Sequence, residues 1–304
     1  MVLLGPTASG KSQLAMALAL ARPGTEIVVA DSMQVYRHMD IGTAKPTTAD
    51  QKSVRHHLID LVEPSHDFTV SEFQAAYRDA IVDIESRGAR ALIVAGTGLY
   101  LRAITDGLTM AGQFPEVRAE LELERDVVAL HARLLALDPV AASRMEPSNR
   151  RRIERALEVT LGSGRPFSSF GEGLTAYAPI GLCQVGIRFD RGRQAQLVQS
   201  RVLAMMAGGW LDEVRSLNTR SIGRTAAQAL GYRELFAHLN GECSLDDAIA
   251  TTVVRTRQFA ARQIRWFRRD PRITWFEIDA EKNSLDVVDL ALRQYDSTTR
   301  SLVQ

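Results

Sequence analysis

The feature that most constrains this chain is a glycine-rich segment close to its start. Residues 5–12 read GPTASGKS and fit the pattern G-x-x-x-x-G-K-[ST]. The segment follows an apolar run at 1–4 and precedes a helix-forming run at 13–21. In this context the glycines let the loop wrap a phosphate closely, and backbone N–H groups at the helix start point at the anion. We therefore expect a polyphosphate to bind the loop residues Gly5, Pro6, Thr7, Ala8, Ser9, Gly10, Lys11 and Ser12.

Two side chains of the loop add to this attraction. Lys11 brings a positive charge, and the Ser12 hydroxyl is a ligand for Mg²⁺. An incidental glycine-rich turn is the alternative, but it would not explain the strand before the loop and the helix after it. The signature by itself leaves open whether the bound group is a nucleotide or a diphosphate ester.

Short apolar runs alternate with amphipathic segments along the chain. We expect buried strands at 1–4, 27–30, 91–95, 184–189 and 273–278. Helical segments separate the first three, among them 71–87, which has apolar residues along one side. Strands that alternate with helices form a parallel sheet with crossover helices. The sequence therefore predicts an α/β fold of the P-loop NTPase type, a parallel sheet with flanking helices.

The character of the chain changes near residue 115. Charged helical segments are predicted at 116–136 and 139–160, and a loop rich in Gly, Ser and Phe follows to 179. We expect a small all-helical insertion domain at 113–183, within a core made of 1–112 and 184–304. The core should continue with helices near 193–217, 225–239 and 245–268, whereas 38–67 is predicted to be mostly loop.

The composition narrows the class of protein. The formal net charge is +1, so any grip on nucleic acid must come from local basic patches. Cys183 and Cys243 lack the spacing of a zinc site or a disulfide framework. No secretory signal and no apolar run of about 20 residues is visible, so we expect a cytoplasmic protein without membrane contact. We also expect a monomer, because no sustained heptad pattern occurs.

Asp31 ends the second predicted strand. In an open α/β sheet, ligands gather at the carboxyl ends of the strands, so Asp31 should lie near the phosphate loop. There it could bind Mg²⁺ together with Ser12, or act as a general base. The alternative is an aspartate that only caps a helix or a turn.

The residues after Asp31 carry a resemblance to a known family. Segment 31–46, DSMQVYRHMDIGTAKP, is similar to the signature of the tRNA dimethylallyltransferases, the bacterial-type IPP transferases. Further similar segments follow in the family's order: 56–60 (HHLID), 96–100 (GTGLY), 227–234 (AQALGYRE), 256–260 (TRQFA) and 262–267 (RQIRWF). The resemblance spans nearly the whole chain, and the joint pattern is far more specific than the phosphate loop.

The resemblance implies a reaction. The exocyclic amine of an adenosine just 3′ of the anticodon attacks the first carbon of dimethylallyl diphosphate, and diphosphate leaves. Asp31 matches the family's base, which a weakly nucleophilic aryl amine needs. Lys11, Mg²⁺, the loop amides and Arg201 would neutralise the leaving diphosphate. Thr97 matches a threonine that contacts the target nucleotide, although a helix cap is the alternative for it, as a solvated helix arginine is for Arg201.

The resemblance also implies a tRNA-binding surface for the anticodon stem-loop. Basic residues cluster at 150–155 on the insertion and at 255–269, which we expect to be one long helix interleaved with aromatics. Such patches bind phosphates, and aromatics stack on bases or fill the core. The Gln34 amide has a donor and an acceptor for a base edge. The implied contacts are Asp31, Ser32, Met33, Gln34, Thr97, Arg118, Arg151, Arg152, Arg155, Gln228, Gly231, Tyr232, Arg233, Arg262, Gln263 and Arg265.

Three other functions share part of this pattern. A P-loop kinase for a small molecule shares the loop, the Mg²⁺ and the sheet, but it leaves the arginine clusters unexplained. An isopentenyltransferase for free adenine nucleotides shares the loop and Asp31, and it differs in the acceptor alone. A non-catalytic RNA-binding module would leave the phosphate loop without a role.

Overall fold

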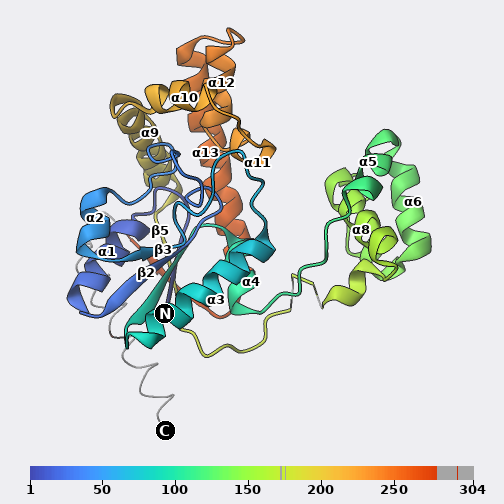
Figure 1. The fold of residues 1–304 in the computed structure, drawn as a ribbon, viewed down its shortest axis with the longest axis horizontal. Helices are drawn as coiled ribbons and strands as arrows, with labels where there is room; N and C mark the ends of the chain where they lie inside the picture. The colour runs from blue at the N-terminus through green and yellow to red at the C-terminus, as the bar shows by residue number, and fades with distance from the viewer. Residues whose placement is uncertain (172, 175, 279–292, 294–304) are drawn as a thin grey trace. The chain divides into compact units, whose positions relative to one another are not determined.

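The computed structural model describes residues 1–171, 173–174, 176–278 and 293 of the chain (Figure 1). The chain forms two units, one of Met1–Asp106 with Pro179–Gln304 and one of Gly107–Ala178. The second unit begins and ends a few residues earlier than the insertion expected at 113–183. Among the described residues, no helix combines the length and the apolar character needed to cross a membrane.

The first unit is built on a parallel six-stranded sheet with the order β3-β2-β4-β1-β5-β6. This is the α/β architecture that the sequence predicts. The strands are β1 Val2–Leu4, β2 Thr25–Ala30, β3 His56–His57, β4 Arg90–Ala95, β5 Gln184–Arg188 and β6 Ile273–Glu277. Only β3 lies in a segment expected to be loop, because two residues are too few to show a strand pattern.

The central strands are apolar because helices cover both faces of the sheet. Leu3 and its neighbours on one face pack against α1 (Lys11–Ala21). Leu4 lies on the other face, in a cluster with Phe73 of α3 (Val70–Ser86) and Leu101 of α4 (Gly98–Thr105). Adjacent residues of a strand point to opposite faces, so both faces are buried by a nearly continuous apolar run.

The strand order brings three connecting loops together. β1 pairs with β4, and β4 pairs with β2, so the loops that follow these strands leave from the same edge of the sheet. They are the phosphate loop, the segment that starts at Asp31 and the segment 96–97. The topology therefore collects the predicted site residues of three distant segments.

The segment 38–67 is more ordered than the sequence predicts. It contains α2 (Thr48–Ser53) as well as β3. Helix α2 begins with a capping box, in which the Thr47 side chain accepts from the N–H of Asp50 and the Asp50 carboxylate accepts from the N–H of Thr47. A helix of six residues is too short for an apolar period to reveal it.

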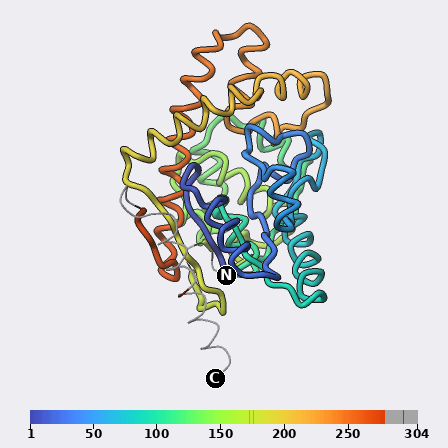
Figure 2. Tube along the Cα trace, turned by 90° about the vertical axis from the view of Figure 1, so that its left-hand side faces the viewer, coloured from blue at the N-terminus to red at the C-terminus, as the bar shows by residue number. Residues whose placement is uncertain are grey.

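Five helices form a second core in the first unit. They are α9 (Arg191–Ala207), α10 (Trp210–Asn218), α11 (Arg224–Ala227), α12 (Tyr232–Leu239) and α13 (Leu245–Phe267). The helix expected at 193–217 is two helices, because Gly209 adopts a left-handed conformation with φ 94° and starts α10 anew. α13 runs from α12 to the sheet (Figures 1 and 2). Trp210 and Tyr232 pack here against Val35, Tyr36 and Met39 of the segment after β2.

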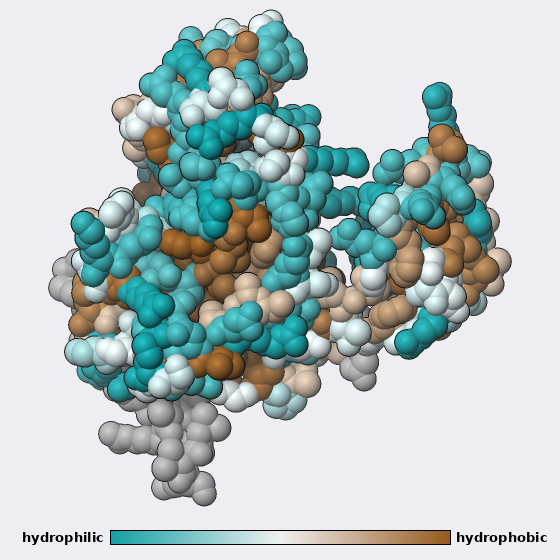
Figure 3. Space-filling view, viewed as in Figure 1, coloured by the Kyte–Doolittle hydropathy of each residue, from teal (hydrophilic) through white to brown (hydrophobic). Residues whose placement is uncertain are grey.

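The second unit has its own core. Its helices are α5 (Pro115–Leu123), α6 (Val127–Leu137), α7 (Pro139–Ser143), α8 (Arg150–Ser163) and the 3₁₀ helix η1 (Phe167–Phe170). Asp126 caps α6 and divides the helix expected at 116–136, and Asn149 caps α8 and divides the helix expected at 139–160. Leu130, Leu134 and Leu157 fill the centre. Apolar side chains also face solvent on α5 to α7 (Figure 3), namely Leu123, Val128, Leu135, Leu137 and Val140.

A substitution at Gly42 tests how tightly the segment after β2 packs on the helical core. A Cβ there would lie 2.1 Å from Nε1 of Trp210 and 2.5 Å from Cε2 of Tyr232. Both rings are buried, so Gly42→Ala should lower the free energy of unfolding by about 2 kcal/mol, measured by urea denaturation. Gly181→Ala is the control, since no atom lies within 4 Å of its Cβ position. Equal effects of the two substitutions would contradict this packing.

Candidate active site

The phosphate loop joins β1 to α1 in the manner expected. Gly10 adopts a left-handed conformation with φ 77°, and α1 begins at the next residue, Lys11. Gly5 lies against β5, where a Cβ would come within 2.6 Å of the backbone oxygen of Ile187. Both glycines are therefore required by the shape of the loop. The N-terminus of α1 opens where the loop ends, which places backbone N–H groups and the positive end of the helix dipole at one point.

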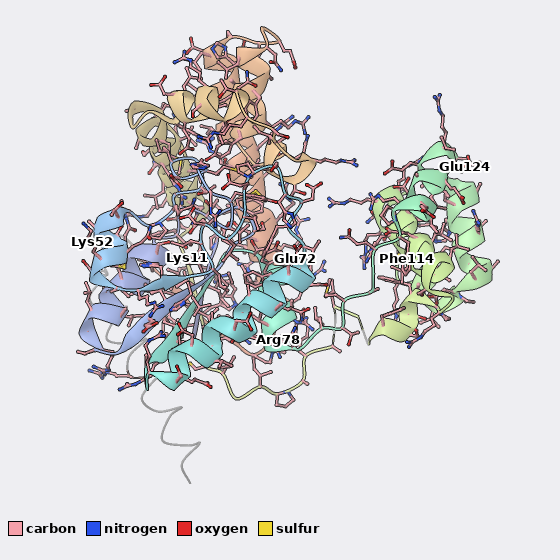
Figure 4. All side chains as sticks on the ribbon, in the orientation of Figure 1. Lys11, Lys52, Glu72, Arg78, Phe114 and Glu124 are labelled. Carbon is pink, nitrogen blue, oxygen red and sulfur yellow. The ribbon has the colours of Figure 1, made fainter. Side chains whose placement is uncertain are left out.

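Lys11 and Arg201 form a partly buried pair of cations. The pKa of Lys11 is lowered to about 8, chiefly by burial and also by the nearby charge of Arg201, while Asp31 acts in the opposite direction. Burial also lowers the pKa of Arg201, against the effect of Asp31. Lys11 lies at the start of α1 (Figure 4), and Arg201 comes from α9. The structure thus brings Lys11, Asp31 and Arg201 within electrostatic reach of one another.

This charge arrangement favours an anion. Two cations and one carboxylate leave a net positive charge where desolvation already penalises the charged forms. A phosphate group bound beside Lys11 would compensate that penalty. The helix N-terminus acts in the same direction, so backbone and side chains select the same kind of ligand.

The two oxygens of the Asp31 carboxylate have different surroundings. Oδ1 accepts hydrogen bonds from the backbone N–H of Met33 at 2.8 Å and of Gln34 at 3.3 Å. Oδ2 lies 3.4 Å from the position of a Cβ added at Gly96, and Cε of Lys11 lies 3.5 Å from the same position. The turn that holds Oδ1 therefore orients the carboxylate toward the phosphate loop. Oδ1 therefore caps a turn, which is the alternative role considered for Asp31. Oδ2 takes no part in that turn and is the oxygen positioned for a ligand.

Thr97 connects the loops after β2 and β4. Its Oγ1 accepts from the backbone N–H of Ser32 at 3.3 Å and donates to the Ser32 hydroxyl at 3.5 Å. Thr97 immediately precedes α4, but its side chain makes no capping hydrogen bond with that helix. The structure thus favours a role between the two loops over a helix cap.

A magnesium ion fits these residues when phosphate supplies further ligands. Within the described ranges, no group of three or more His, Cys, Asp and Glu residues could hold a metal. Mg²⁺ commonly binds to one or two protein oxygens, several waters and the phosphates of a substrate. Ser12, exposed in the first turn of α1, and Asp31, with its Oδ2 toward Lys11, are oxygen donors of this kind.

Three residues implied as RNA contacts lie inside the first unit. The Gln34 side-chain amide donates to the backbone oxygens of Thr43 and Ala44. Tyr232 is 1% exposed, its hydroxyl donates to Glu213, and Gly231 lies against Trp210. In the structure these residues pack against other residues or hold a loop in place, whereas the resemblance implies contacts with RNA. They are buried because the segment after β2 and the start of α12 pack against each other.

Gln263 is also buried, with 6% of its surface exposed. Its Oε1 accepts from the backbone N–H of Thr7 at 2.8 Å, and its Nε2 donates to the backbone oxygen of Gly96 at 2.7 Å. Gln194, which belongs to none of the sequence motifs, donates to the backbone oxygen of Thr7 at 2.5 Å. A glutamine within a helical pattern carries no sequence signal for such a contact.

In the second unit, Arg118 and Arg155 share a buried acid. Arg155 lies 2.7 Å from Oε1 of Glu158, and Arg118 lies 3.5 Å from its Oε2. Glu158 is 2% exposed and also accepts from the backbone N–H of Phe114, which precedes α5 (Figure 4). Arg150 is paired with Glu154 at 2.6 Å, whereas Arg151 and Arg152 are exposed at the start of α8. Together with Arg118, the basic cluster therefore contains three ion-paired arginines and two solvated ones.

The arginines near the C-terminal end of the first unit are mostly exposed. Arg262 and Arg265 lie on the solvent side of α13, and Arg262 stacks over the Phe259 ring at 5.9 Å. α13 ends at Phe267, so Arg268 and Arg269 lie at and beyond its end rather than on the helix as expected. Phe267 lies in the core beside the sheet. Gln228 and Arg233 are exposed and hydrogen-bonded to each other.

Comparisons with known proteins identify the family of this chain. The model of a family described as IPP transferase matches residues 34–270. A tRNA dimethylallyltransferase of Geobacter metallireducens is 47% identical, over 93% of this chain and 94% of that protein. One from Streptomyces coelicolor is 46% identical, over 90% and 88%.

Solved structures share the fold. The tRNA isopentenylpyrophosphate transferase of Bacillus halodurans aligns with a TM-score of 0.71 and 34% identity, over 100% of this chain and 98% of that one. A eukaryotic dimethylallyltransferase acting on tRNA aligns with a TM-score of 0.74, over 91% of this chain and 73% of that one. Its 24% identity supports the likeness of fold alone.

The lowered pKa of Lys11 predicts a proton uptake on anion binding. In the free protein the amine loses its proton as the pH rises through about 8, whereas a bound diphosphate stabilises the ammonium. Binding of inorganic diphosphate at about pH 9 should therefore take up a proton. Calorimetry in buffers of different ionisation enthalpy measures this. Lys11→Met should abolish the uptake, and Lys52→Met, exposed on α2 (Figure 4), should retain it. Unchanged uptake in Lys11→Met would assign the proton to another group.

Proposed function

This chain belongs to the IPP transferase family, and from that premise we propose that it transfers a dimethylallyl group from dimethylallyl diphosphate to tRNA. The acceptor is the exocyclic amine of an adenosine just 3′ of the anticodon, and diphosphate is released. The observation that carries the proposal is the meeting of Lys11, Arg201 and Asp31 beside the phosphate loop. Relatives named tRNA dimethylallyltransferase that match over nearly the whole chain support it.

The reaction needs one bond formed, one broken and one proton moved. The adenosine nitrogen forms a bond to the first carbon of the dimethylallyl group while the bond from that carbon to the diphosphate oxygen breaks. The amine proton passes to a base. Oδ2 of Asp31 faces the phosphate loop, while Oδ1 is held by backbone N–H groups, and this geometry supports Asp31 as that base.

The charges around the phosphate loop stabilise the leaving diphosphate more strongly than the intact substrate. Diphosphate gains negative charge as the carbon–oxygen bond breaks, and Lys11, Arg201 and the N–H groups at the start of α1 stabilise that charge in place. When bound, Mg²⁺ would be held by Ser12 and Asp31 with the phosphates, and would neutralise part of the same charge. We assign phosphate binding and leaving-group stabilisation to the loop.

The acceptor enters from the side of Ser32 and Thr97. An adenosine must leave its stack to reach a base beside the phosphate loop, and enzymes that modify bases extrude the target nucleotide into a pocket. The Ser32 and Thr97 hydroxyls are next to Asp31 and bonded to each other, which supports a role in holding that nucleotide. Ser32 and Thr97 would then set the distance between the amine and Asp31.

Exposed arginines would hold the anticodon stem-loop. Arg151 and Arg152 on α8, Arg233 on α12, and Arg262 and Arg265 on α13 have charged groups open to solvent. Since the net charge is +1, these local clusters supply the attraction to phosphate, which weakens as salt rises. We propose that the protein binds tRNA as a monomer in the cytoplasm.

The acceptor distinguishes this function from its rivals. The purified protein with labelled dimethylallyl diphosphate and Mg²⁺ should label unmodified tRNA at the adenosine beside the anticodon and leave AMP unlabelled. Label in AMP alone would make the protein a free-nucleotide isopentenyltransferase. An absence of label in both, with turnover of ATP, would make it a kinase.

Asp31→Asn tests the base. The amide cannot take the amine proton, so kcat should fall about a thousandfold, while the dissociation constant for tRNA changes little. Asp79→Asn, exposed on α3, is the matched control and should keep full activity. Recovery of the Asp31→Asn variant at high Mg²⁺ would instead assign Asp31 to metal binding, and full activity would remove it from the reaction.

A further inference from the structure

Two glutamines from distant helices hold the two backbone polar groups of one residue of the phosphate loop. The backbone N–H of Thr7 donates to Oε1 of Gln263 on α13 at 2.8 Å, and the backbone oxygen of Thr7 accepts from Nε2 of Gln194 on α9 at 2.5 Å. Both glutamines are 6% exposed. Donor and acceptor of the same residue are thus fixed by side chains that are buried and have a defined orientation.

Gln263 makes a second bond that reaches the neighbouring loop. Its Nε2 donates to the backbone oxygen of Gly96 at 2.7 Å, immediately before Thr97. The absence of a side chain at Gly96 leaves room for the Gln263 amide, Cε of Lys11 and Oδ2 of Asp31, each within 3.5 Å of a Cβ position there. One amide therefore links the phosphate loop to the loop that carries Thr97, beside the proposed base.

The same helix fixes the other side of Thr97. Trp266 packs so closely on Gly98 that a Cβ there would come within 2.2 Å of the indole ring. Gln263 and Trp266 are three residues apart and share a helix face. Thr97 is therefore held between two residues that both contact α13, and α13 also presents Arg262 and Arg265 to solvent.

We propose that Gln263, together with Gln194, is a positioning residue for the transfer reaction, which sets the phosphate loop relative to Asp31, Thr97 and Arg201. Gln194 precedes Arg201 by seven residues, about two helical turns, so both lie on one face of α9. A bond from Gln194 to the loop thus also fixes the distance between Arg201 and a bound diphosphate. The proposal rests on the proposed function.

A direct contact of Gln263 with RNA, which the family resemblance implies, is the competing role. The observed geometry favours positioning, because both ends of the amide are engaged with backbone groups inside the protein. The two roles predict different effects of a Gln263 substitution on diphosphate binding in the absence of RNA. A positioning residue should affect it, whereas an RNA contact should not.

The test measures binding of inorganic diphosphate with Mg²⁺ to the full chain, without tRNA. In Gln263→Glu the carboxylate still accepts from Thr7 but faces the Gly96 oxygen and Asp31 without a proton to donate, and Gln194→Glu loses its donor to Thr7. Each should weaken diphosphate binding about tenfold, since a buried acceptor loses its partner and the introduced carboxylate repels the diphosphate. Binding of tRNA should change less than twofold. Gln196→Glu, exposed on α9, should behave as the parent.

The pH gives a second readout that loss of folding would not reproduce. As the pH falls toward the pKa of the introduced carboxyl, its protonated form can donate to Gly96 again. The affinity ratio between the parent and Gln263→Glu should therefore shrink toward one in mildly acidic buffer, while Gln196→Glu shows no such trend. Thermal unfolding shows whether each variant folds. If Gln263→Glu does not fold, diphosphate binding to Gln194→Glu decides the proposal.

The outcomes distinguish failure of the positioning proposal from failure of the proposed function. Parent-like diphosphate binding in folded Gln194→Glu and Gln263→Glu overturns the positioning role. Weakened tRNA binding with unchanged diphosphate binding in Gln263→Glu assigns that residue to the RNA contact instead. A parent protein that binds no diphosphate and labels no tRNA overturns the proposed function itself.

Discussion

The parallel pairing of β1, β4 and β2 is the constraint on which the site depends. Parallel neighbours end at the same edge of a sheet, so the loops that follow these strands must share one region. Lys11, Thr97 and Asp31 come from those loops and meet there although the sequence separates them widely. Helices on both faces keep the strands buried, while the loops at this edge offer backbone groups to a ligand.

The site stores an unfavourable charge arrangement that a phosphate ligand relieves. Lys11 and Arg201 lie close together in a partly buried position, and Asp31 compensates only part of their repulsion. Buried like charges cost free energy, which the fold tolerates because its extensive apolar cores stabilise it elsewhere. In the proposed reaction a diphosphate completes the balance, and its charge grows as the transition state is reached. The same arrangement therefore binds the substrate and stabilises the leaving group more strongly.

Sequence and structure agree best where a local pattern has a physical cause. The phosphate loop is predictable because Gly5 and Gly10 are needed for close approach and for a left-handed turn. Buried strands are predictable from their apolar runs, and β5 and β6 end within a residue of the bounds expected. The short elements α2 and β3 are missed, since they span too few residues for periodicity. The break at Gly209 divides a continuous amphipathic pattern that the sequence alone presents as one helix.

By itself, the sequence determined the fold class, the phosphate loop, Asp31 and, through a resemblance over most of the chain, the family. Those features depend on local residue types or on ordered motifs, which a linear chain displays directly. Only the tertiary structure decided which implied contacts are buried and which are open to solvent. Gln194 and Gln263 meet at Thr7 although 187 and 256 residues separate them from it, and Tyr232 is enclosed by packing against Trp210. Burial and long-range hydrogen bonds depend on how helices dock on the sheet, and no local pattern records that.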